Sequence, residues 1–344
     1  MKMIHKIVTL AGDGIGPEIL AAALAVLEKV AKQTGFHYEA IPCEFGGVAI
    51  DKYGLPLPEA TLAIAKSSDA ILHGTIGDPK YDQSSVRPEQ GLLALRKELG
   101  LFANIRPLKI YDALKDISPV KNIENVDFVV VRELTGGIYF GEHQLEEDKA
   151  FDICTYERFE IQRVARVAFE LARKRRKHVT SIDKQNVLAT SKLWRRVVTE
   201  VAAFYPDVKL VHQLVDSAAM RLITHPLEFD VILTENLFGD ILTDEVAAIA
   251  GTLGVMASSS TGISTSLYEP IHGSAPDIAG MGIANPIGMI LSVAMMLDSS
   301  FGQKEAAFKI EQAVGEALKD GIFTKDLGGT ASTVQMCDEI IARL

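Results

Sequence analysis

Two aspartates, Asp240 and Asp244, stand four residues apart where a strand pattern gives way to a helix pattern. On a helix this spacing points both carboxylates the same way, which is unfavourable for unpaired anions and suits a shared divalent cation. The preceding apolar run 229–234 predicts a buried strand, so the acids follow the carboxyl end of a strand, where open α/β sheets bind ligands. Asp240 is expected near the helix start, where the helix dipole favours negative charge. A solvated acidic helix start without a ligand is the alternative interpretation.

Three arginines, Arg96, Arg106 and Arg132, stand at or near the ends of predicted elements. Guanidinium groups bind carboxylates through two parallel hydrogen bonds, so together they could hold a dicarboxylate. Tyr139 in a glycine-flanked turn adds a phenol, and Lys184 just after a predicted strand adds an amine. Taken singly, each arginine is better explained as a surface ion-pair partner than as part of a binding site. Tyr139 alone would be a half-buried aromatic ring, and Lys184 alone a solvated surface amine. Only their combination indicates chemistry.

The glycine-rich segment 12–18 follows a strand pattern and opens a helix pattern, so a phosphate-binding loop has to be considered. After Gly14 and Gly16, the dinucleotide fingerprint requires a third glycine where Ile19 stands, and no Walker lysine follows. A tight turn with Pro17 in the first helical turn is the alternative.

The composition excludes several classes of protein. The 344 residues are 48% hydrophobic and 23% charged, as in ordinary globular chains, and the net charge of −10 argues against nucleic acid and anionic membranes as partners. Residues 1–8 hold too short an apolar run for a secretory signal, and 286–297 is too short to span a bilayer. Because Cys43, Cys154 and Cys337 form no disulfide or zinc pattern, we expect a cytoplasmic protein.

Short β-branched runs alternate with helix patterns along the chain, which is the rhythm of α/β units. We expect strands near 7–10, 70–73, 128–131, 179–182 and 208–211, and helices near 18–32, 90–99, 157–177 and 192–204. The basic block 173–178 is interpreted as cations at the negative end of a helix, not as a nucleic-acid contact.

Seven segments together form a specific pattern. They are GDGIGPE (12–18), LFANIRP (101–107), VRELTGGIYFG (131–141), the helix pattern 157–177, SIDKQNVL (181–188), NLFGDILTD (236–244) and HGSAPDIAGMGIANP (272–286). In this order, and over nearly the whole chain, they resemble the β-decarboxylating dehydrogenases, the family of 3-isopropylmalate and isocitrate dehydrogenases. The stretch 87–96 is similar to the substrate-pocket helix of the 3-isopropylmalate branch.

The resemblance implies an α/β fold of the isocitrate/isopropylmalate dehydrogenase type, which is not a Rossmann fold. Its large twisted mixed sheet has flanking helices and two subdomains. Residues 1–101 with 251–344 would form the cofactor-binding subdomain, and residues 102–250 the subdomain for metal, substrate and dimerisation. The family forms homodimers with active sites shared between subunits, which implies that Lys184 and Asp216 act in the neighbouring subunit's site.

The resemblance also assigns roles to single residues. Tyr139 and Lys184 would be the catalytic acid–base pair, and Asp216, Asp240 and Asp244 would bind Mg²⁺ or Mn²⁺. The implied substrate-binding residues are Arg96, Arg106, Arg132, Glu89, Leu92, Leu93 and Asp216. The implied cofactor-binding residues are His272, Gly273, Ser274, Ala275, Pro276, Asp277, Ile278 and Asn285.

The side chains favour one substrate and one coenzyme within the family. Leu92 and Leu93 offer no donor to the additional carboxylate of isocitrate or homoisocitrate, whose burial there would be costly, whereas an isopropyl group fits. Asp277 can accept a hydrogen bond from a ribose hydroxyl but would repel a 2′-phosphate, which favours NAD over NADP. We therefore expect NAD-dependent oxidative decarboxylation of 3-isopropylmalate, in leucine biosynthesis, with D-malate, tartrate, isocitrate or homoisocitrate as alternative substrates.

Two other classes of protein share parts of this pattern. A Mg²⁺-dependent phosphoryl-transfer enzyme would also use clustered aspartates, but the chain has no Walker loop or kinase signature. A noncatalytic relative would have lost catalytic or metal-binding residues, and all of these positions are present.

Overall fold

The computed structural model describes residues 4–121 and 123–344. The first three residues of the segment considered for a targeting signal, and residue 122, lie outside the described residues. The chain separates into two compact units, one made of residues 1–99, 111–117 and 251–344 and the other of residues 100–110 and 118–250. The separate roles expected for two subdomains stay a prediction.

Five strands of unit 1 lie in the order β2, β1, β3, β12, β11. Their bounds are β1 His5–Gly12, β2 Tyr38–Cys43, β3 Ala70–Thr75, β11 Ala257–Thr261 and β12 Ser266–Pro270. Only the β11–β12 pair is antiparallel among the pairings described within this unit. Every residue of β3 is buried, as expected for a parallel strand covered on both faces.

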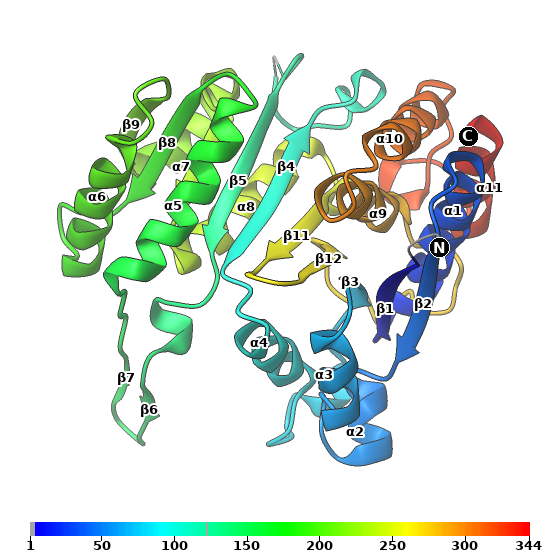
Figure 1. The fold of residues 1–344 in the computed structure, drawn as a ribbon, viewed down its shortest axis with the longest axis horizontal. Coiled ribbons are helices and arrows are strands. Elements are labelled where there is room, and N and C mark those ends of the chain that lie inside the picture. Colours follow the sequence, from blue (N-terminus) through cyan, green and yellow to red (C-terminus); the bar gives the residue numbers. More distant parts are fainter. Residues whose placement is uncertain (1–3, 122) are drawn as a thin grey trace. The chain divides into compact units, whose positions relative to one another are not determined.

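Helices flank these strands (Figure 1). They are α1 Gly16–Thr34, α2 Gly47–Tyr53, α3 Glu59–Lys66, α4 Pro88–Glu98, α9 Ile287–Ser299, α10 Lys304–Lys319 and α11 Thr333–Arg343. The unit joins both ends of the chain, because α1 packs against α11. The apolar run near 286–297 is the buried helix α9, and no helix of the described residues is both long and apolar enough to cross a membrane.

The glycine-rich segment forms the tight turn between β1 and α1. Gly14 has a φ of 57°, and a Cβ placed there would lie 2.0 Å from the Ser274 carbonyl oxygen. The Asp13 carboxylate accepts hydrogen bonds from the backbone N–H groups of Gly47 and Gly77 at 2.8 and 3.0 Å. The polar groups of this turn therefore bind other loops of unit 1, which favours the turn interpretation over a phosphate loop.

Unit 2 contains a second row of strands in the order β4, β5, β10, β8, β9. The bounds are β4 Ala103–Lys109, β5 Asp127–Glu133, β8 His178–Asp183, β9 Lys209–Leu214 and β10 Val231–Thr234, with β4 antiparallel to β5 and the other pairs parallel. The short strands β6 His143–Leu145 and β7 Ala150–Asp152 form a separate two-stranded ribbon.

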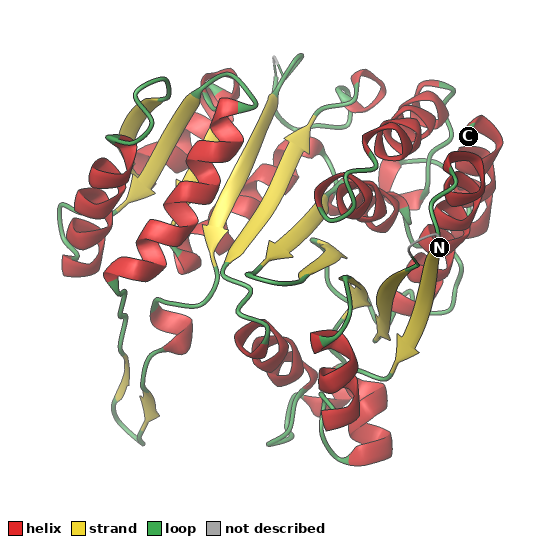
Figure 2. Cartoon of the chain, viewed as in Figure 1, coloured by secondary structure: helices red, strands yellow, loops and turns green. Residues whose placement is uncertain are grey.

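Four helices cover these strands (Figures 1 and 2), namely α5 Arg158–Arg173, α6 Ala189–Ala202, α7 Val215–Thr224 and α8 Asn236–Ala250. The buried face of α5 follows helical spacing, with Ile161, Val164, Ala165, Ala168, Phe169 and Ala172 turned to the core. The fully buried Trp194 of α6 belongs to the same core cluster.

The structure alters two local expectations. The helix expected over 157–177 ends at Arg173, and Arg175 leaves it to bind the carboxylates of Asp127 and Asp230 at 2.5 and 2.9 Å. The basic block is thus largely an ion-pair cluster. The helix that carries Asp240 begins at Asn236, earlier than expected, so Asp240 lies in its second turn, beyond the strongest field of the helix dipole.

Candidate active site

Asp240 is the centre of a polar cluster in unit 2. Its Oδ1 accepts a hydrogen bond from Arg132 Nη1 at 2.5 Å, and its Oδ2 accepts one from the Tyr139 hydroxyl at 2.8 Å. Burial alone would raise the pKa of Asp240, but Arg132, the Tyr139 hydrogen bond and the nearby Arg106 together lower it. The carboxylate is therefore ionised at neutral pH, and these side chains offset the effect of its burial.

Arg132 is held from several sides. Asn236, the first residue of α8, accepts from Arg132 Nε at 3.1 Å and Nη2 at 2.8 Å, and donates to the Gly136 carbonyl at 3.1 Å. A Cβ on Gly239 would lie 2.7 Å from Arg132 Cγ. The glycine of the NLFGD segment therefore makes room for the arginine, which fixes the guanidinium beside Asp240.

Arg106 approaches the same helix from β4. Its Nε donates to Asn104 at 2.6 Å, and its Nη1 donates to the Thr243 hydroxyl at 2.6 Å. Arg106 is buried, and its charge lowers the pKa of Asp240. Together with Arg132, it makes two guanidinium groups that face the α8 segment with Asp240 and Asp244.

Tyr139 lies in a short 3₁₀ turn, Ile138–Phe140, and is 38% exposed. Burial and the hydrogen bond to Asp240 raise the pKa of Tyr139 to about 12. The phenol is therefore protonated at neutral pH and can act as an acid toward a group placed beside it.

Lys184 and Asp216 form a second, separate polar group in unit 2. Lys184 Nζ lies 2.6 Å from Asp216 Oδ1, and the amine lowers the pKa of this exposed carboxylate. Asp216 is the second residue of α7, whereas Asp240 and the exposed Asp244 belong to α8. Within the described residues, no cluster of three or more Asp, Glu, His or Cys side chains is placed to hold a metal ion. One chain thus offers the pair Asp240 and Asp244, without Asp216.

Helix α4 of unit 1 carries the other candidate substrate residues. Arg96 Nη2 donates to Glu269 Oε1 at 3.0 Å, and His73 Nδ1 lies 2.8 Å from Glu269 Oε2. Despite the burial of the carboxylate, Arg96 and His73 hold the pKa of Glu269 at about 2. Leu92 is half-buried and Leu93 is 39% exposed, and both lie within one turn of Arg96. Glu89, one turn before Leu92, is exposed.

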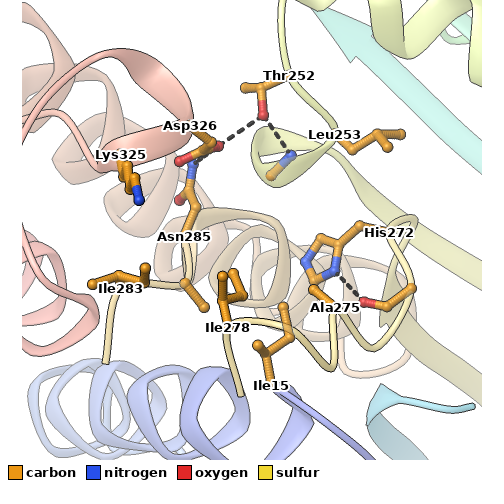
Figure 3. Close-up of a pocket in the computed structure, with 13 residues that line it drawn as sticks. Ile15, Thr252, Leu253, His272, Ala275, Ile278, Ile283, Asn285, Lys325 and Asp326 are labelled. Carbon is orange, nitrogen blue, oxygen red and sulfur yellow. Dashed lines mark hydrogen bonds between the residues drawn. The ribbon is translucent and has the colours of Figure 1, made fainter. Parts of the chain in front are cut away.

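Unit 1 also contains a cavity of about 540 Å³ (Figure 3). Of the expected cofactor residues, His272, Gly273, Ala275, Ile278 and Asn285 line it, whereas Ser274, Pro276 and Asp277 are not among the lining residues. Burial lowers the pKa of His272, which keeps its ring neutral near pH 7. Much of the remaining wall is apolar, which suits a flat aromatic ring system.

Sequence reasoning missed the lining residues outside segment 272–286, including Thr252, Leu253, Lys325 and Asp326. Asp326 Oδ2 accepts hydrogen bonds from Thr252 Oγ1 at 2.7 Å and Asn285 Nδ2 at 3.0 Å. These contacts join three segments that are distant in sequence, and no local sequence pattern predicts them.

The family model for isocitrate/isopropylmalate dehydrogenase matches residues 6–342. The chain belongs to this family. It is 64% identical over 341 residues to a 3-isopropylmalate dehydrogenase of Lactococcus lactis, covering 98% of this chain and 99% of the relative. It is 66% identical over 345 residues to a 3-isopropylmalate dehydrogenase of Streptococcus thermophilus, covering 99% of this chain and 100% of the relative.

Two solved structures share the fold. An isocitrate dehydrogenase from Methylococcus capsulatus superposes with a TM-score of 0.90 at 38% identity, covering 99% of both chains. A β-decarboxylating dehydrogenase from Thermococcus kodakarensis gives a TM-score of 0.84 at 38% identity, covering 99% of this chain and 96% of that chain. The expected family and fold type are thereby confirmed.

The residues present fit the metal and coenzyme that this family uses in general. Asp240 and Asp244 supply carboxylate oxygens, the ligands that Mg²⁺ and Mn²⁺ prefer. Asp240 is already ionised and needs no further deprotonation to bind a cation. The cavity of unit 1 combines apolar walls with a few hydrogen-bonding groups, as dinucleotide and other cofactor sites do.

Proposed function

We propose that this protein catalyses NAD-dependent oxidative decarboxylation of (2R,3S)-3-isopropylmalate to 4-methyl-2-oxopentanoate and carbon dioxide, a step of leucine biosynthesis. The relatives named 3-isopropylmalate dehydrogenase at 64 and 66% identity support this reaction. The structural observation that carries the proposal is the contact of Tyr139 and Arg132 with one ionised aspartate, Asp240. A proton donor and a carboxylate binder are thus arranged around a candidate metal ligand.

Arginines bind the carboxylates of the substrate in this proposal, and leucines select its side chain. Arg96, Arg106 and Arg132 are the proposed carboxylate-binding residues. Leu92 and Leu93 contact the isopropyl group, and Glu89 lies one turn away on the same helix. Isocitrate is the second candidate substrate, because a solved relative at 38% identity is named isocitrate dehydrogenase. Its additional carboxylate would lose hydration beside two leucines, which disfavours it.

Asp240 and Asp244 would hold Mg²⁺ or Mn²⁺ together with Asp216 of the second subunit. The bound cation would lower the pKa of the substrate hydroxyl and stabilise the negative charge that develops on the substrate oxygen. Arg132 lowers the pKa of Asp240 and so favours its ionised form. Segment 272–278 and Asn285 would hold NAD, which would supply the hydride acceptor for the oxidation.

Two residues of the chain move protons in this proposal. Lys184 takes the proton of the substrate hydroxyl, directly or through water. Tyr139, protonated at neutral pH because its pKa is about 12, delivers a proton to the carbon that loses carbon dioxide. Asp240 orients the phenol through the 2.8 Å hydrogen bond.

The adenosine end of NAD would enter the cavity of unit 1, with segment 272–278 and Asn285 as its wall. Asp326 already accepts hydrogen bonds from Thr252, Asn285 and Thr324. Asp277 is exposed next to the cavity-lining Ile278, which leaves its carboxylate available to a ribose hydroxyl. This arrangement supports NAD over NADP.

A homodimer with shared active sites is part of the proposal. Exposed apolar side chains lie on α7 (Met220, 59% exposed), in the turn after it (Leu227, 55%) and on α8 (Ile241, 61%). A contiguous apolar surface formed by them would suit a protein interface. A partner that covers them would bring a second copy of Lys184 and Asp216 near α8. We further propose a cytoplasmic location, which fits three free cysteines.

A parallel assay tests the substrate. NADH formation is measured with 3-isopropylmalate, isocitrate and D-malate at equal Mg²⁺, each with NAD and with NADP. The expected result is the highest kcat/KM for 3-isopropylmalate with NAD. A higher kcat/KM for isocitrate would reject the role given to the leucines.

A further inference from the structure

Glu235 is a buried carboxyl group at the junction of β10 and α8. Glu235 is only 3% exposed. Thr234 pairs with Ile182 in the parallel ladder of β10 and β8, so the next residues along the two strands, Glu235 and Asp183, are neighbours on the opposite face. Two carboxyl groups in one buried place require a reason, because burial disfavours their charged forms.

Glu235 connects the start of α8 to α6 through a hydrogen bond with Ser191, the Glu235–Ser191 tie. The hydroxyl of Ser191, in the first turn of α6, donates to Glu235 Oε1 at 2.5 Å. The same helix makes a second tie, because Trp194 packs edge-on against Tyr156 with ring centroids 5.6 Å apart. The Tyr156 hydroxyl accepts a hydrogen bond at 2.8 Å from the backbone N–H of Asn236, which follows Glu235.

The segment 184–188 is held at both ends by this network. At its start, Asp183 binds Arg195 of α6 through hydrogen bonds of 2.8 and 2.9 Å. At its end, α6 begins, and Ser191 binds Glu235. Between these ends the chain curls over the Lys184 carbonyl, which accepts two backbone hydrogen bonds at 3.0 Å. The place of Lys184 therefore depends on where the start of α6 is fixed.

We infer that Glu235 is a positioning residue, which by binding Ser191 fixes the segment that carries Lys184 relative to the start of α8. The inference rests on the proposed role of Lys184. The start of α8 contains Asn236, which holds Arg132, and one turn later Asp240. Glu235 would thus fix the position of segment 184–188 relative to the helix α8 of the same chain, which carries the proposed metal ligands.

The protonation state of Glu235 affects whether its side chain stays in this buried place. The titratable groups that face Glu235 are Asp183 with its partner Arg195, the Tyr156 phenol and the Cys154 thiol. Burial raises the pKa of both Tyr156 and Cys154, so these two are neutral near pH 7. Burial also raises the pKa of Glu235 to about 7, with a further rise from Asp183. The Ser191 hydrogen bond acts in the opposite direction and lowers this pKa, but it does not offset burial and Asp183. Above this pH the ionised Glu235 is therefore disfavoured in its buried place beside Asp183, which favours displacement of the side chain from Ser191.

Four variants test the inference. Glu235→Ala and Ser191→Ala remove the tie from either side, and Glu235→Gln keeps an acceptor for Ser191 but cannot ionise. Thr199→Ala is the matched control, because Thr199 is another hydroxyl of α6 whose contacts are to Arg195 O and His212, not to β10 or α8. The measurements are kcat and the KM for NAD between about pH 6 and about pH 9, and hydrogen exchange of residues 184–190.

We expect Glu235→Ala and Ser191→Ala to lower kcat by roughly 10- to 100-fold while the KM for NAD stays unchanged, because a displaced base costs orientation and not coenzyme binding. Exchange of residues 184–190 should become faster in both variants and not in Thr199→Ala. Glu235→Gln should match the wild type near pH 6, and its kcat relative to the wild type should rise as the pH passes about 7.

A constant ratio of Glu235→Gln to wild type across this pH range would overturn the inference. So would wild-type kcat and exchange in both Glu235→Ala and Ser191→Ala. The exchange measurement needs no substrate, which separates the inference from the proposed function. If the wild-type protein oxidised none of the three acids, the proposed function would fail, while faster exchange in the two tie variants alone would still support the positioning of segment 184–188.

Discussion

Tyr139 donates its hydroxyl hydrogen bond to Asp240 over 2.8 Å, and this single contact joins the proposed proton donor to a proposed metal ligand. The environment moves the two pKa values apart, since arginines lower that of Asp240 while burial and Asp240 itself raise that of Tyr139 to about 12. Divergent pKa values within one pair distinguish the acid from the ionised group. The sequence motifs could suggest both residues, but only the fold brings them together.

Tyr139→Phe should lower kcat by roughly 10²-fold or more, since it removes a positioned general acid. The KM for 3-isopropylmalate should change little, because Arg132 keeps its contacts with Asp240 and Asn236. Steady-state NADH formation measures both constants. Tyr53→Phe, at a 48% exposed tyrosine of unit 1, is the control and should resemble the wild type. A kcat within a factor of about two of the wild type for Tyr139→Phe would remove this residue from the proton transfer.

Leu93→Ser should weaken the use of 3-isopropylmalate by roughly 1 to 3 kcal/mol in kcat/KM, because a hydroxyl replaces apolar contact with the isopropyl group. D-malate lacks that group and should lose less. The matched control is Ala94→Ser, at the adjacent exposed position of α4. Equal losses for both substrates in Leu93→Ser would contradict side-chain recognition by this leucine.

Asp277→Lys combined with Ile278→Tyr should shift the coenzyme preference toward NADP, because the change removes a carboxylate that repels the 2′-phosphate and adds a cation that binds it. Asp277→Ala alone should mainly weaken the use of NAD. The readout is the ratio of kcat/KM with NAD to that with NADP. If the double variant kept the parental ratio, another group would discriminate the coenzymes.

Glu269→Gln tests the buried ion pair with Arg96 by its dependence on pH. The pKa of Glu269 is held at about 2, below the ordinary 4.5, so its contribution to the free energy of unfolding is present above about pH 4.5 and is lost as the pH falls toward 2. The shift corresponds to about 3 kcal/mol. Urea titration at fixed protein concentration should show a large loss of stability in Glu269→Gln at pH 7, and a much smaller one at about pH 3.

The control for this measurement is Glu98→Gln, which breaks the exposed pair with Lys66. Exposed pairs contribute little to stability, so its effect should be small at every pH. A loss in Glu269→Gln that is equal at both pH values would contradict the lowered pKa.

Much of the architecture could be predicted from periodicity. Continuous apolar runs such as 128–131 became the buried strand β5, and the helix pattern near 18–32 became α1, because hydrophobic spacing reports which face a segment buries. Boundaries were less accurate. The helix expected to 177 stops at Arg173, because the arginines that follow find carboxylates on β5 and before β10, and these partners are distant in sequence.

The candidate site was predictable only where its residues stand in recognisable segments. Lys184 and Asp240 lie in such segments, whereas Asp326 lies in a short 3₁₀ turn and becomes part of a cavity through bonds to Thr252 and Asn285. Glu235 was equally hidden, because a single glutamate at the end of a strand pattern does not reveal that Ser191 will meet it in a buried place. Contacts of this kind depend on tertiary packing.

The separation of Lys184 and Asp216 from the Asp240 cluster leads to a test of the shared active site. Lys184→Ala and Asp240→Ala homodimers should each be nearly inactive, the first for lack of the base and the second for lack of metal binding. In a mixed dimer, one site carries both changes, and the other combines wild-type Lys184 from one chain with wild-type Asp240 from its partner. Random exchange makes about half of the dimers mixed, each with one intact site, so activity should recover to roughly a quarter of the wild type.

Mass-tagged chains confirm the exchange, and NADH formation measures the recovery. If both residues served one site within a single chain, no mixed dimer would contain an intact site, and exchange without any recovery would reject the contribution of Lys184 across the subunit boundary.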